Sequence, residues 1–212
     1  MGMGDKYGIT GLGEAKWVLG MLIERDRDDR AIYISQEAFI NSVMTRFNLT
    51  DAAPVSTPLA TGSFLPAANC PTTQDEKDEM AGRPHRELVG ALAWLALGTR
   101  PDIAFAASTL ARYGHNLGRT HWDAAKRVVR YLKGTSGWRL QLGGHQPEVA
   151  GYTDADWGNN HDDRRSIGAY IVKIGGGAVS WKANKQTCVA LSLTEAEYVA
   201  LCQGREGIGM DD

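Results

Sequence analysis

Residues 151–157 read GYTDADW, and this stretch decides how the second half of the chain is expected to fold. Side chains alternate along an extended strand, so Asp154 and Asp156 share one face with Tyr152. Clustered carboxylate oxygens are the ligands that hard divalent cations such as Mg²⁺ take. The pattern therefore predicts a strand that presents two acids on one surface.

Two further strands are expected after this one. Residues 166–173 (SIGAYIVK) and 178–182 (AVSWK) are rich in β-branched and aromatic residues, which favour strands. The glycines at 175–177 between them are typical of a hairpin. Three antiparallel strands are the simplest interpretation of this region.

A helix is predicted after residue 191, with Ser192 or Thr194 as its N-cap and the apolar positions 196, 199 and 200 facing the sheet. Glu197 then lies in the first turn, and a helix across the sheet would bring it near Asp154. An alternative stays open at this point. Glu197 follows Thr194 by three residues and Glu195 follows Ser192 by three, so either glutamate could complete a capping box.

These residues carry a family resemblance. YTDADW at 152–157, DRRS at 163–166, SWKANKQ at 180–186 and SLTEAEY at 192–198 resemble, in order and spacing, the RNase H domain of copia-type LTR retrotransposon polyproteins. The upstream chain resembles the segment between the polymerase active site and RNase H. The upstream matches are LGEAKWVLG (12–20), ISQEA (34–38), VSTPL (55–59), LVGALAWLALGTRPDI (88–103) and RYLKGT (130–135).

The resemblance implies a chemistry. RNase H of this family nicks RNA in an RNA/DNA hybrid with two metal ions, expected to be Mg²⁺ or Mn²⁺. The resemblance places the first catalytic aspartate at Asp154 and the helix glutamate at Glu197, both as metal ligands. Asp156 is a further candidate ligand, although it and Glu195 match the family pattern away from the usual ligand positions.

The resemblance also implies that the catalytic set is incomplete. In the family the remaining catalytic aspartates follow in segments beyond residue 212, and the polymerase aspartates lie upstream of the Leu-Gly-Glu segment. Gly204, Gly207 and Gly209 stand where the family continues its helix, and they are expected to break it. The chain is therefore expected to be a fragment that is inactive alone, with no nucleotide addition.

The first half is predicted to be mostly helical. Alternation over residues 17–24 predicts a strand that turns through 26–30 into a second strand at 31–35, and a helix capped by Ser35 should follow. Residues 50–84 are expected to form a long connection with a short polar helix near 75–79. Three helices should then cover residues 86–97, 101–113 and 120–133, with a Thr99/Asp102 capping box opening the second.

The expected fold class is therefore α+β. Helices that resemble a reverse-transcriptase thumb and connection region precede an incomplete RNase H-like three-stranded antiparallel sheet with one helix. The expected domains are 1–143, with a linker at about 50–84, and a truncated RNase H-like domain at 144–212.

Two groups of cations are candidates for nucleic-acid binding. Lys126, Arg127, Arg130 and Lys133 crowd one side of the predicted helix at 120–133, and such a face could follow a phosphate backbone. The alternative is that this face is only solvated. Arg164 and Arg165 could contact a phosphate, or they could form local ion pairs with the aspartates at 162 and 163.

Composition limits the remaining possibilities. The net charge of −2 provides no global field that attracts nucleic acid, so binding must rely on local patches. The cysteines at 70, 188 and 202 lack metal-ligand spacing and indicate a reducing compartment. Without a recognisable signal peptide or membrane span, we expect an intracellular protein, cytoplasmic or nuclear.

Three functional hypotheses follow. The first is a fragment of a copia-type polyprotein whose parent performs RNA-directed DNA synthesis and hydrolysis of RNA in RNA/DNA hybrids. The second is a non-catalytic nucleic-acid-binding remnant. The third is an enzyme that regains activity with ligands from elsewhere, for example from the rest of a reverse transcriptase.

Overall fold

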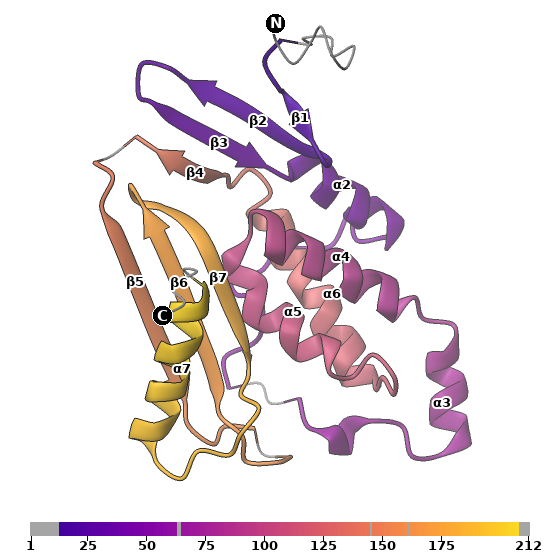
Figure 1. The fold of residues 1–212 in the computed structure, drawn as a ribbon. Coiled ribbons are helices and arrows are strands. Elements are labelled where there is room, and N and C mark those ends of the chain that lie inside the picture. Colours follow the sequence, from indigo (N-terminus) through magenta and orange to yellow (C-terminus); the bar gives the residue numbers. More distant parts are fainter. Residues whose placement is uncertain (1–12, 63–64, 145, 161, 208–212) are drawn as a thin grey trace, which may run out of the picture.

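The structure is a computed structural model that describes residues 13–62, 65–144, 146–160 and 162–207. One four-stranded and one three-stranded antiparallel sheet lie next to a cluster of helices (Figure 1). The α+β class predicted from the sequence is confirmed.

The N-terminal hairpin forms with a shorter first strand than the alternation predicts. The strands are β1 (Trp17–Val18), β2 (Met21–Asp26) and β3 (Ala31–Ser35). Leu19 and Gly20 both have positive φ angles, 51° and 78°, and the chain folds back between β1 and β2. The single strand expected over residues 17–24 is therefore wrong, because a tight turn interrupts it.

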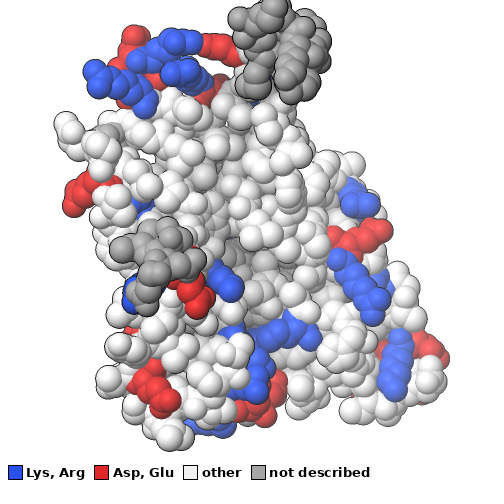
Figure 2. Space-filling view, viewed as in Figure 1, with Lys and Arg blue, Asp and Glu red and all other residues white. Residues whose placement is uncertain are grey.

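The tip of the β2–β3 hairpin is charged, as expected. The Asp26 carboxylate accepts hydrogen bonds from the N–H groups of Asp28 and Asp29, both at 3.0 Å. Figure 2 shows acidic and basic side chains mixed at this end of the molecule. Strand β4 (Leu140–Gly143) completes the sheet by pairing with β3. That strand comes from far along the chain, so no local pattern predicts it.

Helix α2 (Glu37–Arg46) follows the hairpin. The Ser35 hydroxyl oxygen accepts a hydrogen bond from the Glu37 N–H at 3.1 Å, so Ser35 supports the helix start from one residue before the N-cap. The connection at 50–84 contains the short 3₁₀ helix η1 (Ala67–Asn69) and helix α3 (Gln74–Ala81). Thr73 and Glu76 form a capping box at the start of α3.

The main core lies between helices. Helix α4 (His85–Gly98), the 3₁₀ turn η2 (Pro101–Ile103), α5 (Ala104–Ala111) and α6 (Arg119–Gly134) agree with the three predicted helices to within a few residues, apart from η2. Fully buried side chains from these helices build one cluster, with no exposed surface at Leu88, Leu92, Leu95, Leu110, Val128 and Leu132.

The predicted Thr99/Asp102 capping box does not form. The Thr99 hydroxyl instead donates to Gln36 Oε1 at 2.8 Å. Asp102 accepts hydrogen bonds from Arg100 at 2.7 and 3.0 Å and from the Tyr131 hydroxyl at 2.8 Å. Tertiary partners therefore outcompete the local cap, because Arg100 is 2% exposed and its buried charge requires a carboxylate.

The second half contains β5 (Val149–Asp156), β6 (Ile167–Ile174), β7 (Gly177–Lys185) and helix α7 (Leu193–Gly207). The sheet order is β5-β6-β7 and every pair is antiparallel. The predicted strands and helix are all present. Gly204 lies inside α7 and does not break it as expected, whereas Gly207 is the last described residue of the helix and Gly209 lies outside the described residues.

Close packing explains why glycines are accommodated within α7. A Cβ atom at Gly204 would lie 2.9 Å from Thr153 Cγ2, and one at Gly207 would lie 2.5 Å from the Tyr170 ring. The glycines let the helix backbone approach the sheet, and this packing offsets their low helix propensity.

Strand β7 connects the two halves. The Trp181 indole N–H donates to the Ala96 carbonyl of α4 at 2.6 Å. At the start of the strand, Gly177 lies so close to β4 that a Cβ atom there would be 2.1 Å from the Gln141 carbonyl oxygen. The predicted domain boundary near 143–147 falls between β4 and β5, and the two parts are in direct contact.

No helix among the described residues is long and apolar enough to cross a membrane.

We predict that Gly177→Ala lowers the free energy of unfolding by about 1–3 kcal/mol, because the added methyl group overpacks the contact between β7 and β4. Gly151→Ala is the matched control, since a Cβ atom there meets nothing within 4 Å. Urea denaturation of both variants tests this. Equal effects would mean that the close approach at Gly177 contributes nothing.

Candidate functional site

Asp154 lies in β5 with its side chain exposed to solvent. The strand register places Asp154 beside Ala169, and Ala169 beside Ala183. A groove of about 250 Å³ runs between this face of the sheet and the start of α5, and Asp154, Tyr152 and Trp181 line it. The candidate catalytic aspartate therefore lies in an open, largely apolar groove between the two halves.

The hydrogen bonds at the start of α7 show which glutamate caps this helix. The Glu195 N–H donates to the Ser192 hydroxyl oxygen at 3.2 Å, and the Glu195 carboxylate accepts from the Leu191 N–H at 2.7 Å. Glu195 therefore caps the N-terminus of α7. Glu197 is half-buried and has no capping contact in the described structure, which leaves its carboxylate free for another role.

The helix covers the face of the sheet opposite to Asp154. The buried residues Ala196 and Ala200 of α7 form a cluster with Ala155 of β5. Side chains alternate along a strand, so Ala155 and Asp154 point to different faces. In the part of the chain that the structure describes, no group of three or more His, Cys, Asp or Glu side chains could hold a metal ion.

Asp154, Asp156 and Glu197 are thus not gathered into one three-carboxylate cluster. Their chemistry suits Mg²⁺ or Mn²⁺, since carboxylate oxygens are the preferred ligands. We assign no catalytic step of this chain to a metal.

Asp156 contacts polar groups at the end of β5. Its carboxylate accepts a hydrogen bond from the Asn159 side-chain amide. Together with Asn160 and Arg112, the residue just after α5, it lines a cavity of about 370 Å³. Asp156 therefore occupies a polar site at the end of β5.

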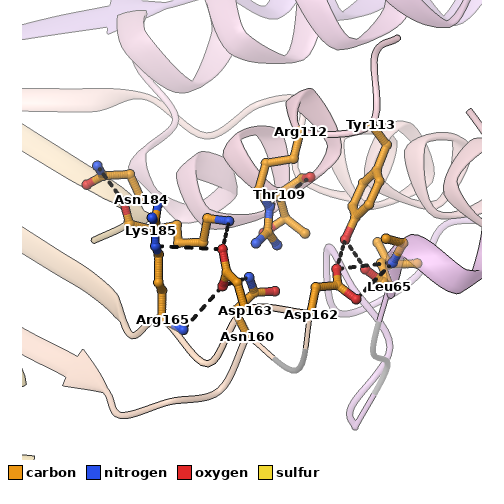
Figure 3. A network of polar contacts seen from close by, with 11 residues as sticks. Leu65, Thr109, Arg112, Tyr113, Asn160, Asp162, Asp163, Arg165, Asn184 and Lys185 are labelled. Atoms are coloured by element: carbon orange, nitrogen blue, oxygen red, sulfur yellow. Dashed lines mark hydrogen bonds and ion pairs between the residues drawn. The ribbon is translucent and has the colours of Figure 1, made fainter. Parts of the chain in front are cut away.

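The loop after β5 is held by two adjacent aspartates (Figure 3). Asp162 reaches the first half, where its carboxylate accepts from the Ala67 N–H at 3.1 Å and the Tyr113 hydroxyl at 3.3 Å. Asp163 faces its own half and accepts from Lys185 Nζ at 2.6 Å and from the Asn160 amide.

The environment of Asp163 keeps it ionised. Burial alone would raise the pKa of this carboxyl, but hydrogen bonds from Lys185, the Arg165 N–H and Asn160 outweigh burial and lower the pKa to about 2. The Arg165 guanidinium lies 3.8 Å from the same carboxylate. The alternative of local ion pairing therefore holds for Arg165, whereas Arg164 is exposed with a φ angle of 58°.

The basic residues of α6 are engaged by the chain itself. Arg127 donates to the Thr57 hydroxyl at 2.9 Å, Arg130 to the Ala53 carbonyl at 2.7 Å, and Lys133 to the Ala52 carbonyl at 3.0 Å. The fourth residue, Lys126, pairs with Asp123 of the same helix at 2.8 Å. Three of the four cations thus fasten residues 50–57 to α6.

Sequence reasoning missed the polar contacts between the halves. Tyr113 and Asp162 are 49 residues apart, and no spacing rule connects them. The run of polar and charged residues at 158–165 (GNNHDDRR) indicates a loop but does not identify its distant partners. On the face shown in Figure 2, basic side chains also lie near the boundary between the three-stranded sheet and the helices.

Comparison with known proteins shows which class of protein the chain belongs to, a transposon polyprotein. The chain belongs to the retrovirus-related Pol polyproteins of copia-type transposons. It is 45% identical over 97% of its length to the Pol polyprotein from transposon TNT 1-94 of Nicotiana tabacum. It is 37% identical over 92% of its length to that from transposon RE2 of Arabidopsis thaliana.

A shorter protein is also similar. The chain is 41% identical over 60% of its length to secreted RxLR effector protein 161 of Plasmopara viticola, and the match covers 90% of that protein. The chain spans only 16% of the tobacco polyprotein and 13% of the RE2 polyprotein. No family model and no solved structure matches the chain.

We predict that Asp163→Asn destabilises the protein by roughly 1 kcal/mol at neutral pH, after discounting for solvent screening. The folded-state pKa of about 2 lies below the ordinary value of 3.8, so the contribution is present above about pH 4. It is lost as the pH falls toward 2.

Urea denaturation of the wild type and the variant between pH 2 and 7 measures this difference. Asp28→Asn, in the exposed hairpin tip, is the control and should show no such dependence. A wild-type advantage over Asp163→Asn that stays constant down to pH 2 would contradict the prediction.

We further predict that Arg130→Gln and Lys133→Gln each lower the free energy of unfolding by about 0.5–2 kcal/mol, because carbonyl groups of residues 50–57 lose their donors. Lys126→Gln removes the same charge from the same helix but only a surface ion pair, so its effect should stay below about 0.5 kcal/mol. Thermal and urea unfolding compare the three. Indistinguishable variants would show that the linker contacts do not stabilise the fold.

Proposed function

We propose that this chain is a reverse transcriptase/RNase H segment of a retrotransposon polyprotein. Its second half contributes Asp154 and Glu197 to metal-dependent hydrolysis of RNA in RNA/DNA hybrids. The parent polyprotein would also perform RNA-directed DNA synthesis. The observation that carries the proposal is the 45% identity to a Pol polyprotein across 97% of the chain.

The geometry of the second half supports this role. A strand carrying Asp154, two further antiparallel strands and a helix carrying Glu197 occur in the order that the RNase H resemblance implies. Glu195 takes the capping role, so Glu197 remains available. Among the described residues β5 pairs only with β6, and its other edge could accept a further strand.

The chain would act as part of a larger assembly. Its described residues hold no three-carboxylate cluster, so we propose that other segments of the polyprotein supply the remaining ligands for Mg²⁺ or Mn²⁺. The expected partners are an RNA/DNA hybrid and the rest of the reverse transcriptase. The expected location is the cytoplasm or the nucleus.

The alternative is a non-catalytic nucleic-acid-binding remnant. It would use the sheet that carries Asp154 and the basic face of α6, where Arg127, Arg130 and Lys133 already donate hydrogen bonds within the chain. If these side chains bound a phosphate group instead, the hydrogen bonds within the chain would be lost. This engagement favours the polyprotein segment over the binding remnant.

The experiment joins this chain to the segment that follows the matched region in the tobacco polyprotein. Cleavage of a labelled RNA/DNA hybrid with Mg²⁺ or Mn²⁺ is then measured for the 212-residue chain and for the extended chain. We predict that the 212 residues alone are folded and inactive, whereas the extended chain cleaves the hybrid. Asp154→Asn and Glu197→Gln should each lower the rate at least about a hundredfold.

Glu195→Gln is the matched control for Glu197→Gln. It changes a glutamate of the same helical turn, and glutamine can still close the cap, so cleavage should persist. Cleavage that survives both Asp154→Asn and Glu197→Gln would refute the assignment of these two carboxylates.

A further inference from the structure

An exposed tryptophan lines a cavity at the junction of the two halves. Trp138 lies between α6 and β4, and 57% of its surface is exposed. The cavity has a volume of about 290 Å³ and is also lined by residues 99–102, which follow α4, and by the turn between β6 and β7. Small-ligand pockets measure about 300–1,000 Å³, so this cavity has room for a single ring system rather than for a large ligand.

Buried neighbours hold the Trp138 indole in place. The Arg100 guanidinium lies over the ring, with its Cζ atom 5.6 Å from the ring centroid. Tyr131 meets the indole almost at a right angle, with ring centroids 6.4 Å apart and an interplanar angle of 88°. Arg100 is itself 2% exposed and is hydrogen-bonded to Asp102 and Thr135. A large exposed ring that is already fixed loses little freedom when a ligand stacks on it.

The charges that line the cavity are paired except at Lys173. Asp102 neutralises Arg100, and Arg139 pairs with Glu24 at 2.7 Å. Lys173 lines the cavity from β6, and among the residues that the structure describes it has neither a hydrogen-bond partner nor an ion-pair partner. The cavity therefore presents one aromatic platform and one uncommitted cation.

A nucleotide of a single strand matches this combination. Proteins that bind single-stranded nucleic acid stack bases on exposed aromatic side chains and hold the backbone phosphates with cations. In a duplex the bases stack on one another, so only an unpaired base has a free face for the Trp138 indole. The ammonium group of Lys173 suits the phosphate as a compact point charge.

The cavity borders on the groove at Asp154. Pro101 lines both, and Lys173 follows the groove residue Ile171 by two positions along β6, so these two side chains point to the same face of the sheet. Asp154 pairs with Ala169, which lies four residues before Lys173, or about 13 Å at roughly 3.3 Å per residue. A strand bound in the cavity would therefore reach Asp154 within a few nucleotides.

We propose that this cavity binds one unpaired nucleotide of a single-stranded nucleic acid, with the base stacked on Trp138 and a phosphate at Lys173. The strand would continue along the sheet face toward Asp154, and this path rests on the function proposed above. The binding of the nucleotide does not rest on it, because neither Asp154 nor Glu197 lines the cavity.

The test is a titration of the 212-residue chain, without Mg²⁺ or Mn²⁺, with a short oligothymidylate and with an abasic oligonucleotide of the same length. The abasic strand keeps the phosphates but carries no base. We expect the thymidylate to bind roughly tenfold more tightly, as stacking of one base on an aromatic side chain implies. In ¹H–¹⁵N NMR spectra the Trp138 indole N–H signal, identified by its loss in Trp138→Phe, should shift and saturate.

Two substitutions at Trp138 separate stacking from other contacts. Trp138→Leu should bind the two oligonucleotides equally, whereas Trp138→Phe keeps a ring and should retain most of the preference for thymidylate. Trp17→Leu is the matched control, since Trp17 is also 57% exposed but does not line the cavity, and it should bind like the wild type. Urea denaturation of each variant verifies that it is folded.

Lys173→Gln tests the phosphate contact. Each phosphate that a cation binds on a single strand contributes about 0.7 to the slope of log affinity against log salt concentration. The variant should therefore lose about that much of the slope. Lys16→Gln, a substitution of an exposed lysine elsewhere in the fold, should leave the slope unchanged.

Equal binding of the thymidylate and the abasic oligonucleotide by the wild type would overturn the proposal. A preference for thymidylate that persists in folded Trp138→Leu would overturn it as well, and an unchanged salt slope in Lys173→Gln would overturn the phosphate contact. These results are separate from the hybrid-cleavage experiment, because they are obtained without metal ions and involve neither Asp154 nor Glu197.

Discussion

The burial of the apolar faces of α4, α5 and α6 against one another is the constraint on which the rest of the structure depends. Leu88, Leu92, Leu110 and Leu132 are completely removed from solvent, and each such side chain contributes about 1.5–3 kcal/mol. The other parts attach to this core. Trp181 docks the three-stranded sheet on the end of α4, and the cations of α6 fasten the linker at 50–57.

Side chains alternate along β5, so one face of this strand packs against α7 and the other face is exposed. Ala155 faces α7 and is buried, while Asp154 lies on the opposite face in the groove next to α5. The helix presents Glu197 without using it as a cap. The same strand thus packs against α7 with one face and exposes Asp154 on the other, so Asp154 and the helix that carries Glu197 lie on opposite faces of the strand.

The cations show why charge in a sequence does not by itself identify a binding surface. Arg127, Arg130 and Lys133 lie on one side of α6 as their spacing predicts, but the connection at 50–57 returns along that side and takes their hydrogen bonds. Arg83 and Arg86, by contrast, stand out little in the sequence. In the fold, Arg86 donates to the Gly114 carbonyl and Arg83 pairs with Glu79.

The sequence by itself determined the family, the three helices of the first half, and the three strands and single helix of the second, because these depend on local propensity and on the alternation of apolar residues. It also placed Glu197 on this helix, although in its first turn, where the structure has Glu195. Only the tertiary structure decided which glutamate caps that helix, what the α6 cations contact, that Asp102 serves Arg100, and that β4 pairs with β3. Most of those outcomes depend on partners that lie far away along the chain. Which polar groups bond to each other is decided by which of them the packed core brings together.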